Sequence, residues 1–228
     1  MKRDGPRGGC RYDLESHRFL DGADWSKAVY WTNADRLDQP EPADGYAGIS
    51  SVGDPSQLYR PAAVAYESLM ISMHQIHRRP NNTICAQGKF PKLTDLELGF
   101  SRDGFHWDRP DRREFIRGVR EVGNRDLAYL HTTTGVFVVL DDRLVFPYCD
   151  YSRNADDGRH SMYGGGEIGL ASLRRDGFAS METVDKPSTL TTRPVKFSGK
   201  HLFVNVDAPQ GELWVGLREA TGKVLAAS

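Results

Sequence analysis

The stretch Ser101-Arg102-Asp103-Gly104-Phe105-His106-Trp107 shows most directly how this chain folds. The side chain of Asp103 can accept hydrogen bonds from the backbone of its own turn, and Gly104 tolerates the positive φ that other residues avoid. Trp107 offers a large apolar face that can cover such a turn. The stretch therefore predicts a tight turn between two β-strands, with a structural and not a catalytic role for Asp103.

Weaker copies of this pattern stand on either side, at Trp25–Trp31 (WSKAVYW) and Leu173–Phe178 (LRRDGF). Taking Trp31, Trp107 and Phe178 as equivalent positions gives a repeat of about 70 residues. A turn of this kind recurs once per blade in β-propellers, and a period this long requires four strands with a long insertion in each blade. The second aspartate of the pattern, Asp176, is likewise expected to serve its turn.

Strand signals dominate the rest of the chain, because helical periodicity is poor and short β-branched or aromatic segments end at Gly, Asp, Asn or Pro. The predicted strands are Ala62–Tyr66, Leu69–His77, Leu96–Ser101, Ala128–Thr132, Gly135–Leu140, Arg143–Cys149, Glu167–Leu173, Arg193–Phe197, His201–Asp207 and Gly211–Leu217. Tight hairpins are predicted at Asp141-Asp142 and at Ser198-Gly199-Lys200. Three long inserts, Asn33–Gln57, Arg78–Thr94 and Tyr151–Gly166, are expected to rim one face.

The character of the sequence changes near Thr189, where regular strands with short turns begin and the Asp-Gly-aromatic pattern ends. This change predicts a boundary near Lys186-Pro187-Ser188. The expected fold is all-β: a partial β-propeller of about three blades over residues 1–187, followed over residues 188–228 by the start of an incomplete β-sandwich.

The composition excludes several classes of function. The 228 residues include 30 Lys+Arg and 31 Asp+Glu, and the resulting net charge of −1 argues against nucleic acid as a partner. No run of 18 apolar residues exists, and no apolar core follows the charged start, so neither a membrane span nor a signal peptide is predicted. The compartment stays unknown, with a cytoplasmic location as the default.

No cofactor or metal is expected. The three cysteines, Cys10, Cys85 and Cys149, are odd in number and far apart, which argues against a disulfide framework or a paired-thiolate zinc site. His74 and His77 would point to opposite faces of a strand. The stretch Gly164–Gly169 matches the G-x-G-x-x-G pattern, but it opens a predicted strand and not a helix, so dinucleotide binding is not expected.

Four stretches, Leu58–Glu67, Leu98–Trp107, Ile168–Phe178 and Leu190–Ala208, resemble a family of glycosidase-like proteins related to the five-bladed propellers of the β-fructosidase and arabinanase type. The resemblance implies a carbohydrate partner held at one end of the propeller channel. It also implies about two further blades before residue 1 and a fuller β-sandwich after residue 228. The blade that typically supplies the general base in that family would then lie outside this chain.

Glycoside hydrolysis needs two carboxyl groups around the scissile bond, roughly 5–5.5 Å apart for retention and 6.5–9.5 Å apart for inversion. Asp126 lies just before the predicted strand 128–132 and Asp150 just after 143–149, so both are expected at the channel mouth, with Asp126 as the first choice. Each of these acids also fits a solvated turn or a structural ion pair. The candidate catalytic residues are Asp126, Asp150 and Glu167, and the candidate substrate-binding residues are Tyr59, Arg60, Glu67 and His160.

Two glutamates, Glu67 and Glu167, stand closest to predicted strands and are candidates for a general acid with a raised pKa. The aromatic residues Trp25, Trp31 and Tyr46 are candidates for a sugar-stacking platform, although aromatic residues in blade turns are more often part of the core.

The leading functional hypothesis is a glycoside hydrolase-like protein. Two alternatives stay open. One is a non-catalytic module that binds carbohydrate or protein through the propeller face. The other is an inactive, truncated piece whose open blade edges favour self-association.

Overall fold

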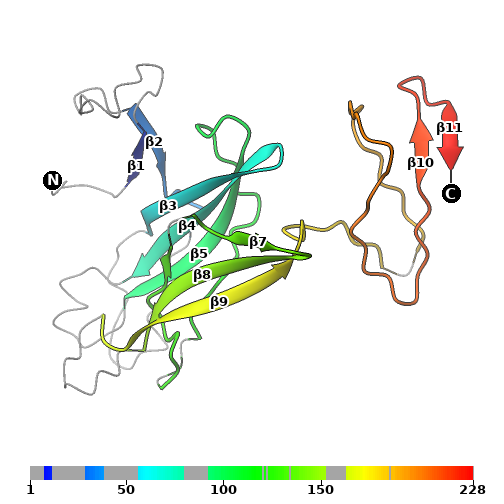
Figure 1. The fold of residues 1–228 in the computed structure, drawn as a ribbon. Helices are drawn as coiled ribbons and strands as arrows, with labels where there is room; N and C mark the ends of the chain where they lie inside the picture. Colours follow the sequence, from blue (N-terminus) through cyan, green and yellow to red (C-terminus); the bar gives the residue numbers. More distant parts are fainter. Residues whose placement is uncertain are drawn as a thin grey trace. The chain divides into compact units, whose positions relative to one another are not determined.

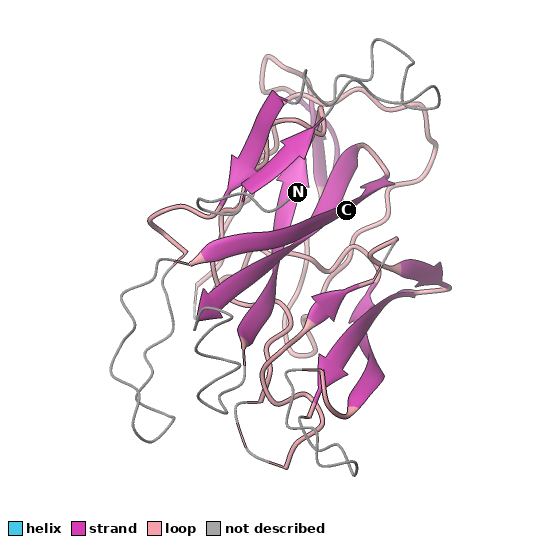
Figure 2. Cartoon of the chain, turned by 90° about the vertical axis from the view of Figure 1, so that its left-hand side faces the viewer, coloured by secondary structure: helices cyan, strands magenta, loops and turns pink. Residues whose placement is uncertain are grey.

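A computed structural model describes residues 8–11, 29–38, 56–79, 92–119, 121, 123–133, 135–152, 163–184 and 186–227. These residues form eleven β-strands and no helix, so the prediction of an all-β chain is confirmed for them (Figure 1 and Figure 2). The described part accordingly contains no helix with the length and apolar character that crossing a membrane requires. Most of the three long inserts, together with Trp25, Tyr46 and His160, lies outside the described residues.

The first sheet is an antiparallel meander of three strands in the order β3-β4-β5: β3 (Gln57–Tyr66), β4 (Leu69–Arg79) and β5 (Leu93–Ser101). The sequence predicted all three strands, each shorter than observed. Pro61 lies inside β3, which is tolerated because β3 is an edge of this sheet and Pro cannot donate to a ladder. A two-residue turn joins β3 to β4, and its first residue, Glu67, has a φ of 50°.

The second sheet contains β6 (His131–Thr132), β7 (Val138–Leu140), β8 (Arg143–Tyr151) and β9 (Gly166–Arg174). Strands β6 and β7 pair with opposite ends of β8, and β9 also pairs with β8. The sheet is therefore a second meander whose first strand is interrupted between β6 and β7, where Gly135 and Val136 have positive φ. The predicted hairpin at Asp141-Asp142 is confirmed as the β7–β8 turn.

Backbone hydrogen bonds connect the two meanders along the free edge of β5. The Thr94 amide donates to the Ala128 carbonyl (2.9 Å), the Leu130 amide donates to the Thr94 carbonyl (3.3 Å), and Thr94 and Tyr129 form a parallel bridge. Burying apolar side chains contributes roughly 25 cal/mol per Å² and drives this association. The buried apolar residues include Leu58, Ile71, Met73, Ile76, Leu93, Leu96, Leu127, Leu130, Leu144 and Phe146.

The strand directions bring many segments to one common end. Since β6 runs parallel to β5 and antiparallel to β8, the starts of β3, β5 and β6 lie at the same end as the finish of β4 and β8. The start of β9 joins them, because the Ser152 amide donates to the Gly165 carbonyl (3.3 Å). We call this the site end. The tight turns at Glu67 and Asp141 lie at the opposite, hairpin end.

The stretch that opened the sequence analysis forms the predicted turn after β5. The Ser101 hydroxyl accepts from the Gly104 amide (2.8 Å), and the Asp103 carboxylate accepts from the amides of Phe105 and His106 (both 2.8 Å). Gly104 has the expected positive φ of 67°. Hydrogen bonds from the His106 side chain and these amides lower the pKa of Asp103, so its turn role accounts for its charge.

The two echoes of this turn differ from it. In the copy after β9, Asp176 and not the following glycine takes the positive φ (59°), while the Gly177 amide donates to the Arg174 carbonyl (3.1 Å). Trp107 and Phe178 both follow the third strand of a meander. Trp31 instead lies inside β2 (Val29–Asn33), which pairs antiparallel with β1 (Gly8–Arg11).

The chain divides into two compact units, Met1–Ser172 and Leu173–Ser228. In the second unit, β10 (Gly216–Arg218) pairs with β11 (Val224–Ala227). The predicted strands Arg193–Phe197 and His201–Asp207 are wrong, and the predicted hairpin at 198–200 lacks flanking strands. None of the described residues of this unit is buried, so these segments lack the covered apolar face that stabilises a strand. The boundary near residues 186–188 stays a prediction.

Candidate functional site at one end of the two sheets

Arg125, just before the 127–130 segment that pairs with β5, brings two of the predicted catalytic residues together. Its guanidinium donates to Asp150 Oδ2 at the end of β8, from Nη2 (2.8 Å) and Nε (3.2 Å). Its Nε also lies 3.8 Å from Glu167 Oε2 at the start of β9. Asp150 is fully buried, whereas the side chains of Arg125 and Glu167 are 47% and 56% exposed. The cluster is therefore anchored inside and open to solvent outside.

The separation of the two carboxylates is limited by these contacts. Asp150 Oδ2 lies 3.2 Å and Glu167 Oε2 lies 3.8 Å from Arg125 Nε. The distance between these two oxygens therefore cannot exceed the sum of those two distances. The other oxygen of Asp150, Oδ1, is buried and has no hydrogen-bond partner among the described residues.

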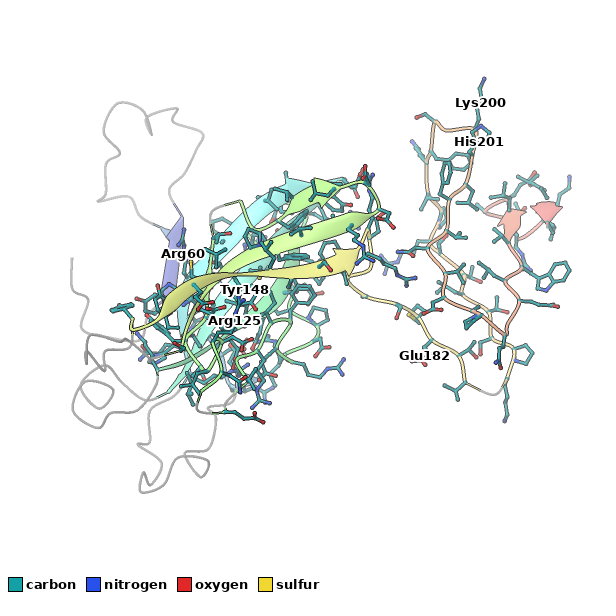
Figure 3. The ribbon with its side chains drawn as sticks, turned by 60° about the horizontal axis from the view of Figure 1, so that its bottom comes forward. Arg60, Arg125, Tyr148, Glu182, Lys200 and His201 are labelled. Atoms are coloured by element: carbon teal, nitrogen blue, oxygen red, sulfur yellow. The ribbon has the colours of Figure 1, made fainter. Side chains whose placement is uncertain are left out.

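Asp126, the third predicted catalytic residue, is half-buried next to Arg125. Burial and the charges of Asp126 and Asp150 raise the pKa of Tyr148 above its ordinary value. Tyr148 on β8 lies beside Arg125 (Figure 3). The structure thus brings Asp150 and Glu167 to one guanidinium and places Asp126 within electrostatic range of the Tyr148 phenol, which keeps its proton at neutral pH. We call Arg125, Asp126, Tyr148, Asp150 and Glu167 the carboxylate cluster.

Two glycines of β9 make room for aromatic rings. A Cβ atom at Gly169 would lie 2.6 Å from Cε1 of Tyr148, and one at Gly166 would lie 3.0 Å from Cε1 of Tyr151. The expectation that the stretch Gly164–Gly169 opens a strand is confirmed. Its glycines let two tyrosine rings lie against β9, and Glu167 stands between these two close contacts.

A group of aromatic rings adjoins the carboxylate cluster. Tyr129 has its ring centroid 5.4 Å from that of Tyr151, 5.6 Å from that of Tyr163 and 4.4 Å from that of His131. Tyr59 lies 6.5 Å from Tyr129 with its ring nearly perpendicular. Burial, with the neighbouring phenols of Tyr59 and Tyr163, raises the pKa of Tyr129. We call these five residues the tyrosine cluster.

The predicted substrate-binding residues are divided by the fold. Tyr59 belongs to the tyrosine cluster, and exposed Arg60 follows it at the start of β3. Glu67 lies at the hairpin end, roughly 25 Å from Tyr59 along an extended strand, so the structure does not bring it to the other candidates. His160 lies outside the described residues.

Sequence reasoning missed a second charged cluster, on β4, β5 and the segments after β2 and β5. Arg109 donates to Asp38 Oδ1 and Oδ2 (both 2.8 Å) and to Glu97 Oε2 (3.1 Å). Arg78 donates to Glu97 Oε1 (2.5 Å), and Arg112 donates to Asp38 Oδ1 (2.8 Å). We call these five residues the buried ion network. The one signal for it in the sequence is the pair Asp95 and Glu97, two residues apart on one face of an otherwise apolar strand.

Burial sets the direction of the pKa shift at Glu97 and His74, but not at Asp38. It raises the pKa of Glu97 to about 7, against the opposing influence of Arg78. Asp38 has a lowered pKa because hydrogen bonds, chiefly from Arg109, outweigh its burial. The neighbouring His74 is kept neutral, with its pKa lowered to about 3 by burial and by the charge of Arg109. Within the described ranges, no group of three or more His, Cys, Asp or Glu side chains could hold a metal ion.

Comparisons with known proteins add little to this geometry. No protein-family model matches the sequence, and no curated protein matches it. Among solved structures, the chain is similar to a protein named "putative glycoside hydrolase" from Parabacteroides distasonis ATCC 8503, with a TM-score of 0.36 and 16% identity. The match covers 53% of this chain and 30% of that chain. This likeness is loose, so the functional argument rests on the site.

Proposed function

We propose that this chain is a carbohydrate-active protein of the glycoside hydrolase type, with the sugar bound at the site end. The observation that carries the proposal is the meeting of Asp150 and Glu167 at Arg125, with Asp126 next to this arginine in the chain and near Tyr148. Because Asp150 and Glu167 each have an oxygen within 3.8 Å of the same Arg125 nitrogen, this arginine holds two acids together at the site end. The adjoining tyrosines supply apolar faces of the kind on which sugar rings stack.

The exposure of the three acids suggests different roles. Asp126 is half-buried and Glu167 is more than half exposed, so these two are proposed to reach the glycosidic bond as base and acid. Asp150 is fully buried and binds Arg125 through two nitrogens, so it is proposed to hold the guanidinium in place. Arg125 then has donor groups left for sugar hydroxyls.

The same proposal includes the finer fold. The two meanders, β3-β4-β5 and the interrupted β6/β7 with β8 and β9, have equivalent strand orders, and Trp107 and Phe178 follow equivalent strands. We therefore propose that they are consecutive blades of a propeller. The channel mouth of that propeller would coincide with the site end.

The rival function is a non-catalytic module that binds carbohydrate through the tyrosine cluster. Its support is that Arg125 pairs with Asp150 and contacts Glu167, as it would in an ion pair that serves only to hold β8 and β9 together. Under this alternative, the site binds oligosaccharides and cleaves none of them.

Mutations in the full chain distinguish the catalytic proposal from the non-catalytic one. Turnover of a panel of aryl-glycosides and oligosaccharides should fall by about 100- to 10,000-fold in Asp126→Asn and in Glu167→Gln, with sugar affinity nearly unchanged. Asp142→Asn is the matched control, because this carboxylate is exposed at the hairpin end. Unchanged turnover in both variants would reject the catalytic assignments. Binding without turnover by the natural sequence would favour the rival, and absence of both would overturn the proposal.

A further inference from the structure

Positive charge collects on the β3 and β5 side of the tyrosine cluster. The Lys92 ammonium lies 4.4 Å from the ring centroid of Tyr59 and 5.3 Å from that of Tyr129, within cation–π range of both. The Tyr129 ring is in turn 5.4 Å from that of Tyr151, so one ring separates the ammonium from Tyr151. Asp150 directly precedes Tyr151, so the tyrosine cluster and the carboxylate cluster share the end of β8.

Tyr59, which directly precedes Arg60 in β3, has its ring centroid 5.6 Å from that of His131, so the start of β3 lies beside His131. The pKa of His131 is lowered to about 4, first by burial and then by the charges of Lys92 and Arg60. Its Nε2 atom is buried and has no hydrogen-bond partner among the described residues. The guanidinium of Arg60 is exposed, and the described residues place no carboxylate within 4.0 Å of it. The exposed cation of Arg60 and the buried cation of Lys92 therefore both act on the His131 imidazole, whose Nε2 atom is unpaired.

We propose that the sugar bound at the site end is acidic, and that Arg60, supported by Lys92, binds its carboxylate or sulfate group next to Tyr59 and His131. This inference rests on the proposed function and names its substrate class. An anionic group at this position would gain Coulomb energy from both cations in a partly desolvated setting. The sugar rings would then cross the tyrosine cluster toward Glu167 and Asp126.

Matched ligands test this directly. Isothermal titration calorimetry at low ionic strength would compare oligouronides (galacturonate, glucuronate and mannuronate forms) with their methyl esters, which carry the same rings without the charge. The acid form should bind at least about tenfold more tightly than the ester, as expected for a hydrogen bond to a charged group. This preference should shrink as salt is added, because salt screens exposed charges.

Variants locate the acid-binding group. Arg60→Gln should weaken binding of the acid form by about 10- to 100-fold and leave the ester unchanged. Lys92→Met, with its apolar stem retained, should reduce the same preference. Arg102→Gln is the matched control, since this exposed arginine lies in the turn at the hairpin end and should alter neither ligand.

The outcomes are distinct. Equal binding of acid and ester, or an acid preference that survives Arg60→Gln, would overturn this inference while the carbohydrate proposal stands. No binding of any sugar, charged or neutral, would instead count against the proposed function itself. A sulfated galacto-oligosaccharide as a third ligand decides which group is preferred, and tighter binding of either anionic form supports the inference.

Discussion

The buried ion network and the carboxylate cluster are built from the same residue types, yet they differ in access to water. In the first, the Arg109 side chain is 4% exposed and both of its main partners, Asp38 and Glu97, are fully buried. In the second, Arg125 and Glu167 are about half exposed, and Asp150 is the one acid that is fully buried. An arginine between two acids can thus form either a buried ion pair that stabilises the fold or a site that solvent and ligands reach. The exposure of its side chain distinguishes these two cases.

The physical consequence concerns what happens when one partner is removed. A buried charge that loses its partner keeps its full desolvation penalty, whereas water replaces the partner of an exposed charge. The buried ion network should therefore respond to mutation through stability. The carboxylate cluster should respond through binding and turnover.

The largest effect is expected for Arg109→Met, which leaves Asp38 and Glu97 without their shared cation. Breaking a buried ion pair in this way costs about 3–5 kcal/mol in the free energy of unfolding. Urea denaturation followed by circular dichroism measures the loss, with Arg113→Met as the control, since Arg113 and its partner Asp111 are both exposed. A loss no larger than that of the control would show that the network contributes little, and the comparison would fail.

A pair of glycine substitutions sharpens the comparison. A Cβ at Gly99 would lie 2.6 Å from Cε1 of His74 beside the buried ion network, and one at Gly169 would lie 2.6 Å from Cε1 of Tyr148 in the carboxylate cluster. Both Gly99→Ala and Gly169→Ala should lower the free energy of unfolding by about 1–3 kcal/mol, as overpacking does. Only Gly169→Ala should also weaken sugar binding, because it displaces Tyr148. Equal sugar affinity in both variants, measured by calorimetry, would contradict the functional separation.

The sequence predicted the parts of this molecule that are local. The turn at Ser101–Trp107 and the hairpin at Asp141-Asp142 follow from side chains acting on their own backbone, and the alternating burial of β8 follows from its period of two. The places of Asp126, Asp150 and Glu167 beside strands predict that they lie near one another, and the meander order brings Asp150 and Glu167 to Arg125. That they serve catalysis stays a prediction.

The parts that the sequence did not reveal depend on distant partners. Arg109 and Asp38 are 71 residues apart, and no local pattern links them. Strands were also predicted at Arg193–Phe197 and His201–Asp207 from β propensity, but propensity acts only where a neighbouring layer covers the apolar face. Glu67 stands beside a strand in the sequence, but the strand direction places it in the β3–β4 turn at the hairpin end, away from the site.

The pH dependence of stability offers an effect whose sign is fixed by the direction of each pKa shift. Because burial raises the pKa of Glu97 from 4.5 to about 7, the folded chain keeps this proton where the unfolded chain has lost it. The stability contributed by Glu97 is complete below pH 4.5 and is lost as pH rises through 7. The neighbouring His74, with its pKa lowered to about 3, acts in the opposite direction, since its contribution is lost as pH falls below 6.5.

Glu97→Gln isolates the first of these contributions, because His74 is present in both proteins. From pH 4.5 to 7 the natural sequence should lose stability relative to the variant, by at most about 1.4 kcal/mol per pH unit. Urea midpoints measured at half-unit intervals give this difference. A difference that is constant with pH, or that grows in the other direction, would contradict the raised pKa.

The smallest effect is expected at the turn from which the fold was first inferred. The Asp103 carboxylate accepts two amide hydrogen bonds and a third from His106, yet it is exposed, so water can replace what Asp103→Asn removes. The variant should lower the urea midpoint less than Gly99→Ala does, and it should leave sugar binding and turnover unchanged. Because hydrogen bonds lower the Asp103 pKa, the difference from the natural sequence should vanish as the carboxylate is protonated at low pH. Any loss of turnover in Asp103→Asn would mean that this acid serves the site as well as its turn, and that exposure alone does not separate structural from functional carboxylates here.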